Sequence, residues 1–329
     1  MNPETLAGLV ALTEIDGIGD SRALELYRTF GEIDAILDSS QSAFAEFHYV
    51  DDDAYDRLRS LDETIEATRS RFERYRDDGI AVIGIEDDRY PPVLTHHHAP
   101  LVIFAIGDPD VLTRRSVSFS GSRETNDVGL TWTRETAREL ADDGYVVVSG
   151  GAEGADTAAH EGALKAGGET VVVLGTGVET PYPESNAPLF DEVVESGGAM
   201  ISHRRPSAGP SRGGFLRRNR TLSALSAALV VVATDGSGGT ASQYEDASRQ
   251  DRQVFVPAST IGVQPCEGIA EIAADGATTV ETAAEIGRWY EEADVRLPTE
   301  PDETVVGTVG GGQATLGEWS TSEDGGGRE

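Results

Sequence analysis

One stretch of the sequence combines arginine with an aromatic side chain and excludes acids. No Asp or Glu occurs from Ser196 to Thr234, although 58 of the 329 residues are acidic. Guanidinium groups bind phosphate through paired N–H donors, and an aromatic face stacks on a nucleobase. The stretch therefore indicates an anion site suited to single-stranded nucleic acid; pairing of the arginines with acids of a neighbouring helix is the alternative. Its arginines and its phenylalanine are Arg204, Arg205, Arg212, Phe215, Arg217, Arg218 and Arg220.

Four loops carry glycine and hydroxyl groups of the kind that surround phosphate. Glycine lets backbone N–H groups approach an anion closely, and a helix that begins after such a loop offers further free N–H groups. Asp156 is expected to cap the helix that it enters or to contact a ribose hydroxyl, whereas His160 is expected to pack in the core. The loops are Gly121-Ser122-Arg123, Ser149 to Gly154, Gly175 to Gly177 and Asp235 to Thr240.

Motifs of common catalytic and metal centres do not occur in the sequence. It contains none of HExxH, GxSxG and GxxxxGK[ST], and no pair of histidines with metal-ligand spacing. His96, His97 and His98 are consecutive, so their side chains point in different directions, and we expect them to lie in a loop. We therefore expect no catalytic residue, no metal site and no cofactor.

The composition is strongly acidic, with a net charge of -32, and every basic residue except Lys165 is arginine. Acid excess with almost no lysine is typical of a halophile that keeps molar salt in its cytoplasm; an acidic protein that repels nucleic acid is the alternative. At molar salt the Debye length is about 3 Å, so local clusters are more informative than net charge. The single cysteine, Cys266, excludes a disulfide framework. The short apolar run Leu225–Thr234 and the lack of a basic secretory signal predict a cytoplasmic protein without a membrane span.

Alternating β-rich runs and helices must position the loops. Unbroken Val and Ile runs between helices predict an α/β, Rossmann-like fold with a parallel sheet and helices on both faces. Such a sheet binds ligands at the carboxyl ends of its strands. The expected strands are 80–85, 101–106, 116–120, 145–150, 170–175, 199–203, 228–234 and 253–257, and the expected helices lie near 127–142, 155–166, 186–196, 217–226, 240–250 and 267–274.

The sequence predicts three segments. Residues 1–78 are expected to form a small all-helical domain, with 51–78 as one helix. Within it, Gly17-Ile18-Gly19 has the pattern of a helix-hairpin-helix (SAM-like) domain, or of an ordinary helical hairpin. Residues 79–290 are expected to form the Rossmann-like domain. The segment 291–329 is rich in glycine and acids and is expected to be a disordered tail.

Motifs in order from about residue 89 to 280 resemble those of the DNA-processing protein A family, also called Smf. The chain departs from the usual pattern at Leu216, where proline is common, and in the shortened loop from Ser237 to Ala241. The motifs are RYPPVL (89–94), FSGSR (119–123), VVSGGAEGADTAAHEGALKAGGETVVVLGTG (147–177), YPESNAPL (182–189), FLRRNRTLSALS (215–226) and DGSGGTASQYEDASRQDRQVFVPAS (235–259).

The resemblance implies a homodimeric Rossmann-like protein that binds single-stranded DNA and catalyses no known reaction. It also implies protection of incoming strands in natural transformation and loading of a RecA-type recombinase, or a RadA-type one in an archaeon. The family's pocket is built from the Gly-Ser-Arg loop, the Ser-Gly loop and the Arg-Asn-Arg region. Together with the loops above, this predicts DNA or phosphate binding by Gly121, Ser122, Arg123, Ser149, Gly150, Gly154, Asp156, Phe215, Arg217, Arg218, Asn219, Arg220, Ser237, Gly238 and Thr240.

Two other functions stay open. Phosphoribohydrolases of the same superfamily release bases from nucleoside monophosphates with a PGGxGTxxE loop. In this chain Gln243, which cannot act as a base, stands at the position of that Glu, and Glu245 lies two residues further on. The other alternative is a nucleotide-sensing module that signals to a partner, which would leave the arginine cluster and Phe215 without a role.

Overall fold

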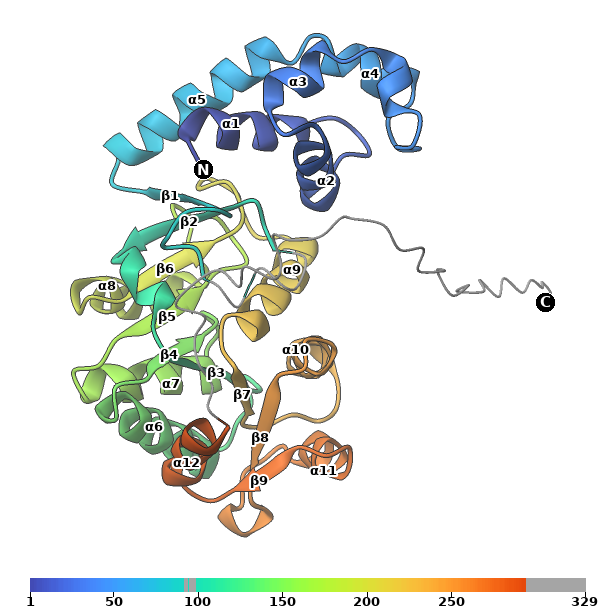
Figure 1. Ribbon diagram of the computed structural model, residues 1–329. Coiled ribbons are helices and arrows are strands. Elements are labelled where there is room, and N and C mark those ends of the chain that lie inside the picture. The colour runs from blue at the N-terminus through green and yellow to red at the C-terminus, as the bar shows by residue number, and fades with distance from the viewer. Residues whose placement is uncertain (92–93, 95–98, 294–329) are drawn as a thin grey trace, which may run out of the picture. The chain divides into compact units, whose positions relative to one another are not determined.

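The computed structural model in Figure 1 describes residues 1–91, 94 and 99–293, which form one compact unit. His96 to His98 and nearly all of the predicted tail lie outside the described residues. Across the described part of the chain, no helix is both long and apolar enough to cross a membrane.

The N-terminal part is helical. Residues 51–78 form two helices, because Asp62 and Glu63 start a new helix where acidic side chains favour the positive N-terminal end. The single helix predicted there is therefore wrong. A core of buried Leu, Ile and Phe side chains holds the helices together, and Leu6 and Phe72 pack against the sheet. The elements are α1 Pro3–Leu12, α2 Asp20–Phe30, α3 Ile33–Asp38, η1 Gln41–Phe44, α4 Asp52–Leu58 and α5 Asp62–Asp77.

A nine-stranded sheet in the order β1-β2-β6-β5-β4-β3-β7-β8-β9 confirms the α/β, Rossmann-like class. All neighbouring strands in the run β6-β5-β4-β3-β7-β8-β9 are parallel, as predicted, whereas the pairs β1–β2 and β2–β6 are antiparallel. An apolar run indicates that a strand is buried, but it does not indicate the direction of the strand. The sequence pattern therefore did not show that the pairs β1–β2 and β2–β6 are antiparallel. The strands are β1 Ala81–Gly84, β2 Val102–Gly107, β3 Ser116–Ser120, β4 Val146–Ser149, β5 Thr170–Val173, β6 Ala199–Ser202, β7 Ala228–Val231, β8 Gln253–Pro257 and β9 Thr278–Val280.

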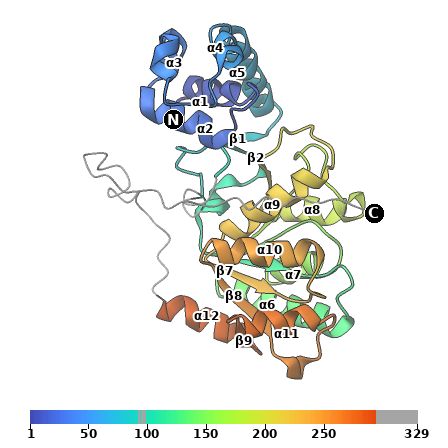
Figure 2. The same cartoon turned by 90° about the vertical axis from the view of Figure 1, so that its right-hand side faces the viewer.

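Helices cover both faces of the sheet, because the Val-rich strands bury both of their faces. In β4, Val146 and Val148 pack with α9, α10 and α11, whereas Val147 packs with α6, α7 and α12. Figures 1 and 2 show these groups on opposite sides. Strand β9 and helix α12 were not predicted. The remaining elements are η3 Pro109–Thr113, α6 Asp127–Asp142, α7 Ala155–Lys165, η4 Glu184–Asn186, α8 Ala187–Glu195, α9 Arg212–Ala224, α10 Gly238–Arg249, η5 Ser259–Ile261, α11 Glu267–Ala274 and α12 Ala283–Glu292.

Helix α9 begins at Arg212, five residues before the predicted start at 217. The Ser211 hydroxyl accepts a hydrogen bond from the Gly214 N–H, which is the usual N-cap contact. The segment from Phe215 to Arg220 therefore lies inside the helix. Its consecutive side chains point about 100° apart around the axis, and the arginines do not all face the same way.

Candidate functional site

The strand order reverses between β3 and β7, and a cavity of about 370 Å³ lies at their carboxyl ends. This is the position at which open α/β sheets bind ligands. The loops after β3, β4 and β7 meet here with α9 and the start of α10. The cavity brings together most of the predicted residues: Gly121, Ser122, Arg123, Asp156, Arg218, Asn219, Ser237, Gly238 and Thr240.

A smaller cavity of about 110 Å³ adjoins the first and shares Arg123, Ala152 and Arg218 with it. Phe215 and Tyr182 line this second cavity, with ring centroids 6.1 Å apart. Tyr182 is 44% exposed, so part of this residue is accessible to a ligand. An aromatic pair therefore lies beside the cationic cavity, with the two arginines between them.

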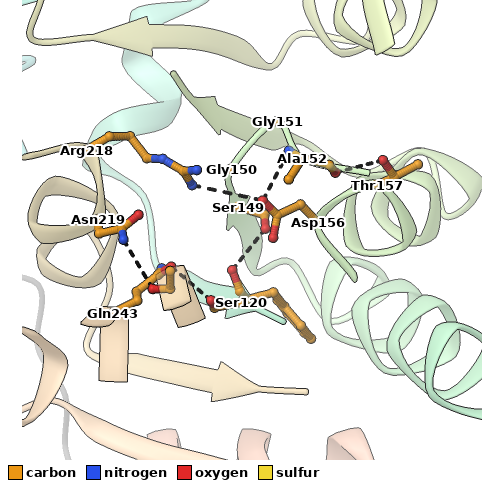
Figure 3. Close-up of polar contacts among 12 residues, drawn as sticks. Ser120, Ser149, Gly150, Gly151, Ala152, Asp156, Thr157, Arg218, Asn219 and Gln243 are labelled. Carbon is orange, nitrogen blue, oxygen red and sulfur yellow. Dashed lines mark hydrogen bonds and ion pairs between the residues drawn. The ribbon is translucent and has the colours of Figure 1, made fainter. Parts of the chain in front are cut away.

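Arg218 and Asp156 form a buried ion pair in the larger cavity (Figure 3). Arg218 Nη1 lies 4.0 Å from Asp156 Oδ2, and the side chains are only 12% and 7% exposed. The Ala152 N–H also donates to Asp156 Oδ2, at 3.2 Å. Burial raises the pKa of the Asp156 carboxyl and lowers that of Arg218, and each charge opposes the shift of the other. The cavity thus holds a guanidinium shielded from water, while the exposed Arg123 forms no ion pair within the described residues.

Three predicted residues shape the loops and do not line either cavity. Ser149 is fully buried, and its hydroxyl donates to the Phe119 carbonyl at 2.9 Å. A Cβ at Gly150 would lie 1.9 Å from Arg218 Nη1, so only glycine leaves room for this guanidinium. Gly154 has φ +89°, and a Cβ there would lie 2.9 Å from the Cα of Arg123. Ser149 therefore holds its loop through a hydrogen bond, Gly150 leaves room for the Arg218 side chain, and Gly154 leaves room for the backbone of Arg123.

The N-terminus of α10 closes the other side of the larger cavity. Gly238 to Thr240 line it, and the first N–H groups of the helix have no intrahelical acceptor and no side-chain cap. Asn219 is buried, and its Nδ2 donates to the Gly239 carbonyl at 3.2 Å, which ties α9 to this turn. Ser120 Oγ donates to Gln243 Oε1 at 2.8 Å. Gln243 lines the cavity but was not among the predicted site residues.

The structure places Arg217 and Arg220 outside the cavity, on another side of α9. They line a separate cavity with Gly17 and Gly19, which lie between α1 and α2. Arg220 Nε lies 3.6 Å from Asp246 Oδ1. Helical spacing is the reason, because Arg217 and Arg220 are three residues apart in α9 and share a face that Arg218 does not occupy.

His160 packs in the core, as predicted. It is fully buried, and its Nε2 donates to the Gly150 carbonyl at 2.8 Å. Burial lowers its pKa to about 4, so the ring is neutral at pH 7. In the described part of the chain, no group of three or more His, Cys, Asp and Glu side chains could hold a metal ion.

Comparison with known proteins gives one consistent family. Residues 81–291 match the model of DNA recombination-mediator protein A. DNA processing protein DprA of Bacillus subtilis is 30% identical over 229 residues, which cover 69% of this chain and 76% of that protein. The chain spans from about half to three quarters of the length of such curated relatives.

Solved structures show the same fold. DNA processing protein A of Streptococcus pneumoniae matches with a TM-score of 0.70 and 24% identity, over 87% of this chain and 97% of that one. A structure of DNA processing protein A of Helicobacter pylori, described for its single-stranded DNA binding mode, matches with a TM-score of 0.58 and 25% identity. That match covers 65% of this chain and 96% of the other.

Proposed function

The chain belongs to the DNA recombination-mediator protein A family, and on that basis we propose that it binds single-stranded DNA at the carboxyl edge of its sheet. We further propose that it protects the strand and loads a RecA-type or RadA-type recombinase, acting as a cytoplasmic homodimer. The Helicobacter pylori relative, whose structure was described for its single-stranded DNA binding mode, supports the choice of ligand. The family description supports the mediator role.

The observation that carries the DNA proposal is the adjacency of cationic and aromatic groups. Arg123 and Arg218 line both cavities, and Phe215 and Tyr182 line only the smaller one. A backbone phosphate near the guanidiniums would leave the neighbouring base beside the aromatic rings. Base stacking needs no particular base, because every base has a π face. This arrangement suits a strand bound without strong sequence preference.

The phosphoribohydrolase alternative receives no support from the geometry. Glu245 is exposed and lies 3.8 Å from Arg249, and it does not line the larger cavity. Gln243 takes the position of the catalytic Glu in that loop, and an amide cannot accept a proton as a base. The nucleotide-sensing alternative leaves the aromatic pair beside the cavity without a role.

Binding of a fluorescent oligo-dT strand, compared with a duplex of the same length in molar KCl, tests the proposal. We expect the single strand to bind more tightly and Arg123→Ala to weaken it by about tenfold or more, the effect of one hydrogen bond to a charged group. Arg212→Ala is the matched control, because Arg212 is also exposed and lines neither cavity. Preference for the duplex, or equal losses in the two variants, would overturn the assignment.

A further inference from the structure

Gln243 carries an unused hydrogen-bond donor inside the protein. Its side chain is 3% exposed, and Oε1 is occupied by the Ser120 hydroxyl at 2.8 Å. The Nε2 atom is buried and has no hydrogen-bond partner among the described residues. A buried donor without an acceptor is unfavourable and rare in native proteins, and a bound molecule that supplies the acceptor is one explanation for it.

Further unpaired donors belong to residues that line the same cavity. Arg218 Nε is also buried without a partner in the described part of the chain. The first N–H groups of α10, from Gly238 to Thr240, are free because the helix has no side-chain cap. Gln243, Arg218 and this helix end all line the larger cavity. Its ligand must therefore present several acceptor oxygens close together.

Two of the three acidic side chains that line the cavity, those of Asp156 and Asp235, are already engaged, and the third, Glu124, is exposed. Asp156 pairs with Arg218 and accepts the Ala152 N–H. Asp235 Oδ1 accepts both the N–H and the hydroxyl of Ser237, and these hydrogen bonds lower the pKa of its carboxyl. The donors that remain are a neutral amide, a guanidinium and the positive end of a helix dipole. Such a set favours an anion over a neutral base carbonyl.

We propose that these three groups bind one backbone phosphate of single-stranded DNA and that Gln243 is a DNA-contacting residue. The inference rests on the proposed function and adds a residue and a ligand group to it. Ser120 has a positioning role. Its hydroxyl holds the acceptor end of the Gln243 amide, which directs the two N–H bonds of Nε2 away from that contact (Figure 3).

The test compares a glutamine inside α10, Gln243, with the glutamine that follows the last residue of this helix, Gln250. Gln243→Leu removes the unused donor, whereas Gln250→Leu makes the same change at a residue that is also buried, at 7% exposure, and does not line the cavity. Gln250 Nε2 donates to the Arg220 carbonyl, so both variants also lose one internal hydrogen bond. We expect oligo-dT affinity to fall about tenfold to hundredfold in Gln243→Leu, the range for a hydrogen bond to a charged group, and to stay unchanged in Gln250→Leu.

Gln243→Glu keeps the shape of the side chain and replaces the donor with an acceptor. It is expected to bind oligo-dT more weakly than Gln243→Leu, because a carboxylate would face the phosphate. Circular dichroism melting of each variant identifies any that fails to fold, and Gln243→Glu still tests the proposal if Gln243→Leu does. Wild-type affinity in a folded Gln243→Glu variant would overturn it.

An abasic strand, which offers only sugar and phosphate, separates the two possible ligand groups. If Gln243 contacts the backbone, Gln243→Leu lowers the affinity for the abasic strand by the same factor as for oligo-dT. A loss seen only with oligo-dT would assign the contact to a base and overturn the phosphate site. Failure of the wild-type protein to bind either strand would instead refute the proposed function on which the inference rests.

Discussion

Gly150 gives the sharpest test of the buried ion pair. In Gly150→Ala the new Cβ would lie 1.9 Å from Arg218 Nη1, 2.7 Å from its Cζ and 2.5 Å from Asp156 Oδ2. Ordinary contacts begin near 3.4 Å, so the guanidinium would have to move by roughly 1.5 Å. Arg218 has a long flexible side chain and can move, but Asp156 lies at the start of α7 and is held there.

The loss of stability in Gly150→Ala comes from the buried Asp156 carboxylate, which the displaced Arg218 would leave without its ion-pair partner. Breaking a buried ion pair typically costs about 3–5 kcal/mol. Here the pair is long, at 4.0 Å, and Asp156 keeps its hydrogen bond from the Ala152 N–H. Its raised pKa also lets the carboxyl take up a proton. We therefore expect Gly150→Ala to lower the free energy of unfolding by about 1–3 kcal/mol and to weaken oligo-dT binding by about tenfold or more.

Gly213→Ala is the matched control, because Gly213 lies in α9 near Arg218 and no atom lies within 4 Å of the added Cβ. This change should raise the free energy of unfolding by up to about 1 kcal/mol, from helix propensity, and leave DNA binding unchanged. Urea unfolding and fluorescence anisotropy measure both quantities. If Gly150→Ala bound oligo-dT as tightly as Gly213→Ala, the reasoning that Gly150 sets the position of a DNA-binding Arg218 would be refuted.

Two further predictions concern salt and pH. Among the arginines of the described residues, only Arg123 and Arg218 line the larger cavity, so the slope of log K against log salt should be about -1.4, at roughly 0.7 per phosphate contact for a single strand. Titrations from low to molar KCl measure it, and a slope near the -4 expected for six arginines would contradict the placement of Arg217 and Arg220. For His160, burial lowers the pKa from 6.5 to about 4, so the unfolded chain binds the proton first as pH falls. The free energy of unfolding should therefore drop by about 3 kcal/mol between those two pH values. His160→Gln should lack this component in urea unfolding at a series of pH values, and an unchanged pH profile would refute it.

The parallel sheet was predictable because its strands carry a signal that survives without tertiary context. Runs such as Val146–Val148 are apolar on both faces, and only a strand covered by helices on both sides tolerates that. The direction of β2 was not predictable, because its residues are just as apolar as those of the parallel strands. Strand β9 was not predicted because only Val280 of its three residues is buried.

The candidate site was partly predictable for a related reason. Glycine and hydroxyl groups after β3, β4 and β7 indicate anion loops, and parallel strands bring such loops to one edge. Gln243 follows no anion loop directly, and the sequence indicated it only through its place at the position of the Glu in the phosphoribohydrolase loop. Its amide is directed by Ser120, which lies 123 residues earlier in the chain, and no local pattern reports a contact over that separation. Its spacing of three and four residues from Thr240 and Gly239, one helical face, was a clue that went unused.

The acid-free stretch from Ser196 to Thr234 shows why counting charges overstates a binding site. Helix α9 turns Arg218 toward the sheet edge, and Arg217 and Arg220 toward the segment between α1 and α2. Arg204 Nη1 donates to the Gly175 carbonyl at 3.0 Å, and Arg205 Nη2 donates to Glu14 at 2.5 Å, so both arginines stabilise the packing of the chain.

At molar salt the number of exposed arginines adds little affinity, since their charges are screened within about 3 Å. A guanidinium that is 12% exposed is screened far less, and its unpaired Nε keeps a directional bond for a ligand. The burial of Arg218, more than the size of the cluster, is therefore what would let this site hold DNA at molar salt.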